Sequence, residues 1–242
     1  MVFGVDPLTL LALAVALFVG SALQGVVGLG LGLVLAPVIG LTEPQLLPGL
    51  ALWLALVYPM LTLTRDWRHA DRPGLAWALG ARVPGTAVGV WLVSLLPIRL
   101  LNVAVGTMVL TAVVLTARSV HLRLTRSTLL GAGFVSGITG TATSIGGPPL
   151  AIVYQREAPD VIRSTLGVYF VAGAALSLVG LGISGEMTLQ ELQLFALLTP
   201  VLLLGFLASG PMRTRLDHAR VRGVLLSVCG TSAVLLILRS VF

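Results

Sequence analysis

The residues of this chain with the clearest chemical potential are Ser144-Ile145-Gly146-Gly147-Pro148-Pro149. Proline is favoured in the first turn of a helix, and glycines before it leave backbone N–H groups accessible. A helix that begins in this way presents N–H donors and the positive end of its dipole, which together bind anions. The sequence therefore predicts an anion site at a helix start formed by Gly146, Gly147 and Pro148.

Hydroxyl side chains lie directly before these glycines, at Thr141, Thr143 and Ser144. Because a hydroxyl group can donate a hydrogen bond to an oxyanion, we expect these side chains to line the same site. Gln155, after the short apolar segment that follows, is a further candidate for the substrate pathway. Polar residues at segment ends are also common caps, so both interpretations stay open.

The first half of the chain has a matching glycine-rich stretch, Gly25-Val26-Val27-Gly28-Leu29-Gly30-Leu31-Gly32. Interrupted apolar segments at corresponding places in two halves are typical of the substrate sites of secondary transporters. We therefore include Gln24, Gly28 and Gly30 among the candidate binding residues. Glycines at this spacing also let membrane helices pack closely, and the sequence does not decide between the two roles.

Arg82 is the one arginine well inside an apolar segment. A charge at membrane depth is costly, and an ionisable residue there is by default a functional candidate. No acid lies well inside the apolar segments to pair with it, so a substrate anion is an attractive partner. The alternative is that the side chain extends to the nearer membrane surface, since ten residues of helix from Arg72 span only about 15 Å.

The composition indicates where these residues must work. The chain has 242 residues, of which 57% are hydrophobic and 10% charged, and its mean hydropathy is +1.03. Such a chain is predicted to be an all-α polytopic membrane protein, in contact with lipid. The net charge of +6 comes from arginines in short loops between apolar runs. That pattern orients membrane proteins, so we expect no nucleic-acid partner.

Ten apolar segments follow one another along the chain: 8–23, 28–41, 46–64, 74–96, 100–117, 128–139, 145–155, 164–183, 190–209 and 223–241. Crossing a bilayer takes about 20 residues, so segments 28–41, 128–139 and 145–155 are too short to cross alone. Irregular backbone at membrane depth is tolerated where it is buried in protein or lines a cavity. We expect the short segments to be parts of discontinuous or re-entrant helices.

An internal repeat is visible at an offset of 116 residues. The matching pairs are Phe18 and Phe134, Val19 and Val135, Gly30 and Gly146, Pro84 and Pro200, Gly89 and Gly205, and Arg99 and Arg215. So many coincidences in one register indicate duplication. We predict a first membrane unit at 1–117, a linker at 118–126 and a second membrane unit at 127–242.

The arginines predict the orientation of these units. If each interrupted segment is counted twice, twelve of the fifteen arginines fall on one side, in the loops 65–73, 118–126, 156–163 and 210–222. The other side holds only Arg99 and Arg239. Because arginine-rich loops face the cytoplasm, both termini are predicted to be extracytoplasmic. Five segments per unit is an odd number, so the second unit would enter inverted.

The sequence disfavours an enzyme. His69, His121 and His218 all lie in loops without metal-ligand spacing, and no histidine lies in a predicted span to activate Ser144. There is no nucleotide-binding P-loop, and the single cysteine, Cys229, lies in an apolar run. We expect no catalytic residue, no metal and no cofactor.

The two breaks, Gly20-x4-Gly25-x2-Gly28-x-Gly30-x-Gly32 and Gly137-x2-Gly140-x5-Gly146-Gly147-Pro148, resemble the TauE/SafE family in pattern and placement. These sulfite exporter-like permeases are also called the TSUP family, and the resemblance covers about Leu8 to Arg239. It implies a permease of the bacterial inner membrane for sulfur-containing anions such as sulfite, sulfoacetate or other organosulfonates.

The resulting hypothesis is a transporter or facilitator that holds an anion between the two breaks and alternates access by rocking one unit against the other. The acids near the spans lie at their predicted edges: Glu157 and Asp160 on the cytoplasmic side, and Glu43, Glu186 and Glu191 on the other. Passive or potential-driven movement therefore fits better than proton coupling. The alternative is a structural or assembly membrane protein whose glycines only pack helices. The direction of transport and the oligomeric state stay open.

Overall fold

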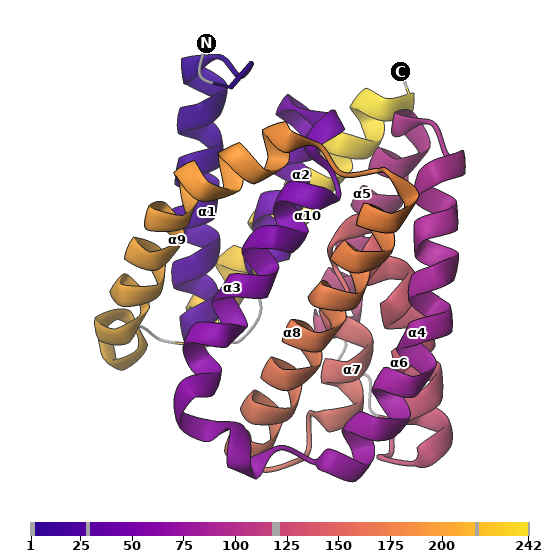
Figure 1. Cartoon of the computed structure of the whole chain (residues 1–242). Coiled ribbons are helices and arrows are strands. Elements are labelled where there is room, and N and C mark those ends of the chain that lie inside the picture. The colour runs from indigo at the N-terminus through magenta and orange to yellow at the C-terminus, as the bar shows by residue number, and fades with distance from the viewer. Residues whose placement is uncertain (1–2, 28–29, 118–121, 216–217, 242) are drawn as a thin grey trace.

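The structure, a computed structural model, describes residues 3–27, 30–117, 122–215 and 218–241. Ten α-helices account for nearly all of this part of the chain (Figure 1). Their bounds are α1 (Pro7–Val27), α2 (Leu31–Thr42), α3 (Gly49–Asp66), α4 (Arg72–Leu95), α5 (Ile98–Ala117), α6 (Arg126–Thr143), α7 (Gly147–Tyr154), α8 (Pro159–Ser184), α9 (Leu189–Arg215) and α10 (His218–Val241). Single turns of 3-10 helix, Pro44–Leu46 and Trp67–His69, precede α3 and α4.

Several helices have the length and composition of membrane spans. In the described part of the chain, five stretches qualify: Pro7–Val26, Arg72–Leu95, Ile98–Leu115, Pro159–Ser184 and Leu189–Met212. At 1.5 Å per residue, helices of this length match the roughly 30 Å of hydrocarbon in a bilayer. The predicted all-α, polytopic membrane fold is confirmed.

Each predicted apolar segment corresponds to one helix, and two of the three short ones remain short. Helix α2 has 12 residues and α7 has 8. The third is longer than its predicted bounds of 128–139, because α6 runs for 18 residues, from Arg126 to Thr143, before it ends at the second break. Its polar C-terminal turn stays helical since the Thr143 hydroxyl donates to the Thr139 carbonyl, 2.7 Å away, and so needs no partner outside the helix.

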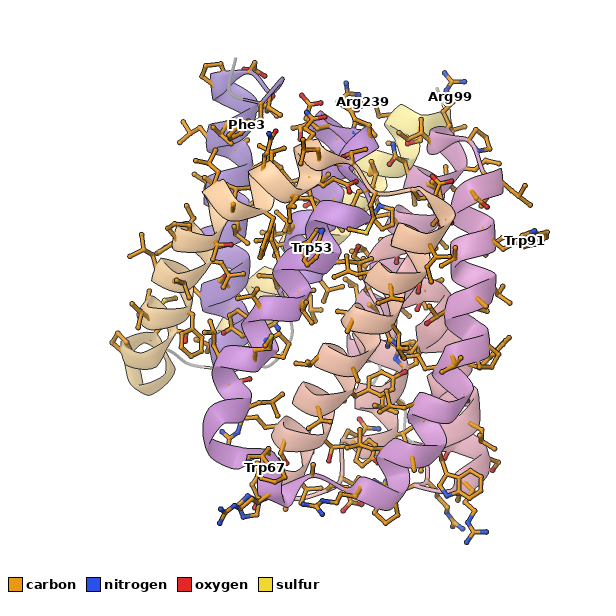
Figure 2. The ribbon with its side chains drawn as sticks, viewed as in Figure 1. Phe3, Trp53, Trp67, Trp91, Arg99 and Arg239 are labelled. Atoms are coloured by element: carbon orange, nitrogen blue, oxygen red, sulfur yellow. The ribbon has the colours of Figure 1, made fainter. Side chains whose placement is uncertain are left out.

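The helices on either side of each break form a hairpin, and the two hairpins enter from opposite ends of the molecule. Figure 2 places Phe3, Arg99 and Arg239 at the end that carries both termini, with Trp67 at the other end. Arg239 donates to the Leu41 carbonyl, so α2 returns to the end with the termini. Tyr154 is the last residue of α7, and its hydroxyl donates to Asp71, which lies four residues after Trp67. Helix α7 therefore returns to the Trp67 end of the molecule.

Glycines bring the long helices into close contact. On the α4–α6 interface, a Cβ built on Gly133 would lie 2.1 Å from the Ala78 carbonyl oxygen. On the α1–α9 interface, a Cβ built on Gly205 would lie 2.6 Å from the Phe18 carbonyl oxygen. No larger residue fits at such distances, so these glycines set the spacing of the two helix pairs that support the hairpins.

Candidate functional site

The two breaks meet inside the molecule. A Cβ built on Gly32, in the first turn of α2, would lie 3.1 Å from the carbonyl oxygen of Ser144. Gly30 has a φ of 157° and Ser144 a left-handed φ of 61°, so the chain turns sharply at both points. The Ser144 hydroxyl donates to the Pro48 carbonyl at 2.9 Å and so ties the second break to the start of α3.

A cavity of about 80 Å³ lies at this meeting point. On the same measure one water molecule needs roughly 10–15 Å³, so the cavity has room for a small molecule of a few heavy atoms. Helices from both halves of the chain contribute to its wall. The candidate residues that line it are Gln24, Gly30, Arg82, Ser144, Gly146, Gly147 and Pro148.

The Arg82 side chain points into the protein. It is 3% exposed, and its Nη1 donates to the Ser136 hydroxyl on α6 at 3.0 Å. Its Cζ lies 4.8 Å from the centre of the Tyr169 ring on α8, within the range of a cation–π interaction. Its Nε has no hydrogen-bond partner among the described residues. Of the two sequence interpretations, the structure therefore favours an inward guanidinium over one that reaches the membrane surface.

Two glycines make room for this guanidinium. A Cβ built on Gly173 of α8 would lie 2.2 Å from Cζ of Arg82, and one on Gly140 of α6 would lie 2.9 Å from its Nη2. Since carbon contacts are normally 3.5 Å or more, a larger residue at Gly173 would push the guanidinium aside. Sequence reasoning missed Gly173, Tyr169 and Ser136, because they reach Arg82 only through the packing of α4, α6 and α8.

The two helix starts at the cavity are built differently. At α2, the Gln24 side-chain carbonyl accepts a hydrogen bond from Leu31 N at 2.9 Å, so this amide already has a partner. At α7, Gly147 is followed by Pro148 and Pro149, which have no N–H groups. The backbone N–H groups that the start of α7 can offer are therefore those of Gly146 and Gly147. The Gly146 carbonyl accepts a hydrogen bond from the Ser136 hydroxyl.

Comparison with known families identifies the chain. The sequence model described as "Sulfite exporter TauE/SafE" matches residues 12–236, nearly the whole length. The chain belongs to the TauE/SafE sulfite exporter family. This match confirms the resemblance inferred from the two breaks. Proteins of this family are membrane transporters and not enzymes. No curated protein and no solved structure matches the chain.

Some candidate residues of this TauE/SafE protein lie away from the cavity wall. The Thr141 hydroxyl pairs with Ser177 at 2.7 Å, and the Thr143 hydroxyl donates within its own helix. Gln155 follows the last residue of α7 and is exposed, so it lies outside the cavity wall as well. Gly28 lies outside the described residues. Ser144 lines the cavity, but its hydroxyl donates to the Pro48 carbonyl.

Two acids of the TauE/SafE chain have more elaborate surroundings than the sequence indicated. Asp71 caps α4 by accepting from Gly74 N at 3.0 Å, and it also accepts from the Tyr154 hydroxyl at 2.8 Å. Glu191, expected at the outer edge, is at the start of α9 but only 1% exposed. It accepts from Thr188 N at 3.1 Å, as in a capping box. Both carboxylates therefore serve helix starts, and neither lines the cavity.

Proposed function

We propose that this TauE/SafE protein moves small sulfur-containing anions, such as sulfite, sulfoacetate or another organosulfonate, through the cavity between the two breaks. The observation that carries the proposal is the buried guanidinium of Arg82. A buried charge is costly unless it is paired. Among the described residues that line the cavity there is no carboxylate, so a substrate anion is the natural partner for this cation.

The helix starts support the same assignment. The N-terminus of α7 meets the cavity with its glycine amides and the positive end of its dipole. The α2 start lies across from it, with Gly32 against Ser144. An anion there would take donors from Arg82 and from the second break, while the first break closes the other side.

We also propose that units 1–117 and 127–242 are inverted repeats that rock against each other. Their support is the arrangement of the helices. The offset of 116 residues relates helices α1–α5 to helices α6–α10, so α1 corresponds to α6 and α4 to α9. Helix α4 packs against α6, and its counterpart α9 packs against α1 in the same way. Hairpins α1–α2 and α6–α7 enter from opposite ends, as inverted units would require.

We place the end of the molecule near Trp67 in the cytoplasm of a bacterial cell and both termini outside the inner membrane. The arginine distribution supports this orientation. Arg68 and Arg72 lie in or next to the 3-10 turn at the Trp67 end, whereas Arg99 and Arg239 lie at the end of the termini (Figure 2). Since no carboxylate lines the cavity among the described residues, passive or potential-driven movement is the simplest form of transport.

A structural or assembly role is the alternative, and one observation favours it. The glycines of the α4–α6 interface, such as Gly85 and Gly133, are needed for close packing whether or not an anion binds. That role predicts that no anion stabilises the purified protein against heat. It also gives no reason for a guanidinium to be buried in the wall of a cavity.

Anion flux into proteoliposomes tests the proposal. Vesicles with the purified protein should take up sulfite or an organosulfonate faster than protein-free vesicles. A Gly147→Leu variant should lose this flux, because the side chain would fill the cavity at the start of α7. The matched control is Gly230→Leu on α10, where a Cβ meets nothing within 4 Å. Uptake at the protein-free rate for every sulfur oxyanion would refute the function.

A further inference from the structure

The charge of the cavity limits what it can hold. Arg82 is the one cationic side chain among the described residues of the wall, and no acid accompanies it. Its contacts, Ser136 and Tyr169, are neutral groups that leave the positive charge uncompensated. One anionic group would therefore neutralise the site, whereas a second would remain buried without a partner, which is strongly unfavourable.

Hydrogen-bond donors are limited in the same way. The Leu31 amide is taken by Gln24, and the hydroxyls of Ser136 and Ser144 are directed to backbone carbonyls. The prolines of α7 have no N–H groups to add. The guanidinium of Arg82, whose Nε has no partner among the described residues, and the glycine amides at the start of α7 are donors that suit a single anionic head group.

Another part of the wall is hydrocarbon. Leu52, Ala55 and Pro59 contribute it from α3, and Phe170 and Ala174 from α8. Oxygen atoms turned toward this wall would lose their hydrogen bonds to water without replacement, whereas an alkyl group would gain from leaving water. With about 80 Å³ in total, the space beyond a sulfonate group suits a substituent of a few carbons.

We propose that this cavity selects monoanionic sulfonates with a short alkyl substituent and discriminates against dianions such as sulfate and sulfoacetate. The sulfonate oxygens face Arg82 and the start of α7, and the alkyl group lies against α3 and α8. The inference rests on the proposed function, since it describes the substrate of the same site, and it narrows the sulfur anions named there to one charge class.

Ethanesulfonate and sulfoacetate make a matched pair for the test, because they differ only in a methyl group against a carboxylate. In proteoliposomes at equal concentration, ethanesulfonate flux is expected to exceed sulfoacetate flux by at least about tenfold. Sulfoacetate flux equal to or above ethanesulfonate flux would overturn the inference while leaving the proposed function intact. Flux of neither compound, or of any other sulfur oxyanion, above protein-free vesicles would instead refute the function itself.

A variant of the apolar wall makes the test independent of the wild-type result. Leu52→Lys replaces an apolar side chain of the α3 wall with a cation of similar volume and should raise the ratio of sulfoacetate to ethanesulfonate flux by at least about tenfold. Leu52→Met, with a side chain of similar volume and no charge, should keep the wild-type preference. Both variants are compared by gel filtration and thermal unfolding to confirm that they fold. A ratio unchanged by lysine in a folded protein would contradict the assignment of this wall to the substrate.

Discussion

The guanidinium of Arg82 lies over the ring of Tyr169, with 4.8 Å between Cζ and the ring centre. Both residues are buried. Arg82 comes from α4, before the 118–126 linker in the sequence, and Tyr169 comes from α8, after it. The ring supports the cation without neutralising it, so Arg82 keeps its charge for an anion while its plane is held in place. This contact is the basis of the first prediction.

Tyr169→Leu should weaken anion binding while Tyr169→Phe should not. A desolvated cation–π contact contributes about 2 kcal/mol, so its loss should raise the KM for flux roughly 30-fold. Phenylalanine keeps the ring and loses only the long 3.4 Å hydrogen bond to the Gly133 carbonyl. Flux kinetics of the two variants check this, and equal KM values would show that the ring does not position Arg82.

Gly173→Ala should impair flux more than stability. The added methyl group would lie 2.2 Å from Cζ of Arg82, and the flexible side chain can move away, out of its position at the cavity. We expect at least about a tenfold loss of flux, equivalent to 1.4 kcal/mol of binding, with a nearly unchanged unfolding temperature. Gly80→Ala on α4 is the control, since a Cβ there meets nothing within 4 Å. Wild-type flux in Gly173→Ala would show that the position of the guanidinium is unimportant.

The α4–α6 interface allows a matched test of packing. Gly133→Ala would place a Cβ 2.1 Å from the Ala78 carbonyl oxygen, whereas Gly131→Ala, on the same helix, meets nothing within 4 Å. Overpacking of this kind costs about 1–3 kcal/mol, so Gly133→Ala should unfold at a clearly lower temperature. Gly131→Ala should be as stable as the wild type or slightly more so. Equal unfolding temperatures for the two variants would contradict the close approach of α4 and α6.

Much of the fold could be predicted from the sequence because membrane insertion depends on local properties. The length of each apolar run and the position of each arginine were enough to separate α1 from α2 and α6 from α7. The end of α6 could not be predicted, since the three threonines at 139–143 look like a loop in a hydropathy pattern. The Thr143 hydroxyl bonds to a carbonyl of its own helix instead, and the Thr141 hydroxyl bonds to Ser177 of α8.

The candidate site could be predicted only in part. Glycine and proline signal a break by their own backbone properties, so Gly30, Gly146 and Pro148 were found. The partners of a hydroxyl group depend on neighbours far away in the chain, and this is why Thr141 was assigned to the cavity although it pairs with Ser177. The surroundings of Arg82 likewise combine residues from three helices, and no spacing in the sequence brings Ser136 and Tyr169 together.

Labelling of single cysteines tests the orientation. In a Cys229→Ala background, Arg68→Cys marks the exposed turn before α4, and Glu186→Cys marks the exposed loop between α8 and α9. A membrane-impermeant maleimide added to intact cells should label Glu186→Cys and leave Arg68→Cys unlabelled until the membrane is opened. The reverse pattern would place the arginine-rich end outside and refute the proposed topology.

Arg82→Gln tests the central claim most directly. Truncating one partner of a buried charge pair costs about 2–5 kcal/mol, so sulfur-anion flux in proteoliposomes should fall at least roughly 30-fold. Arg99→Gln, at an exposed position in the first turn of α5 and outside the cavity wall, should keep wild-type flux. Thermal unfolding of both proteins confirms that they are folded. Loss of flux in Arg82→Gln alone is the predicted result, and wild-type flux in a folded Arg82→Gln protein would contradict the account.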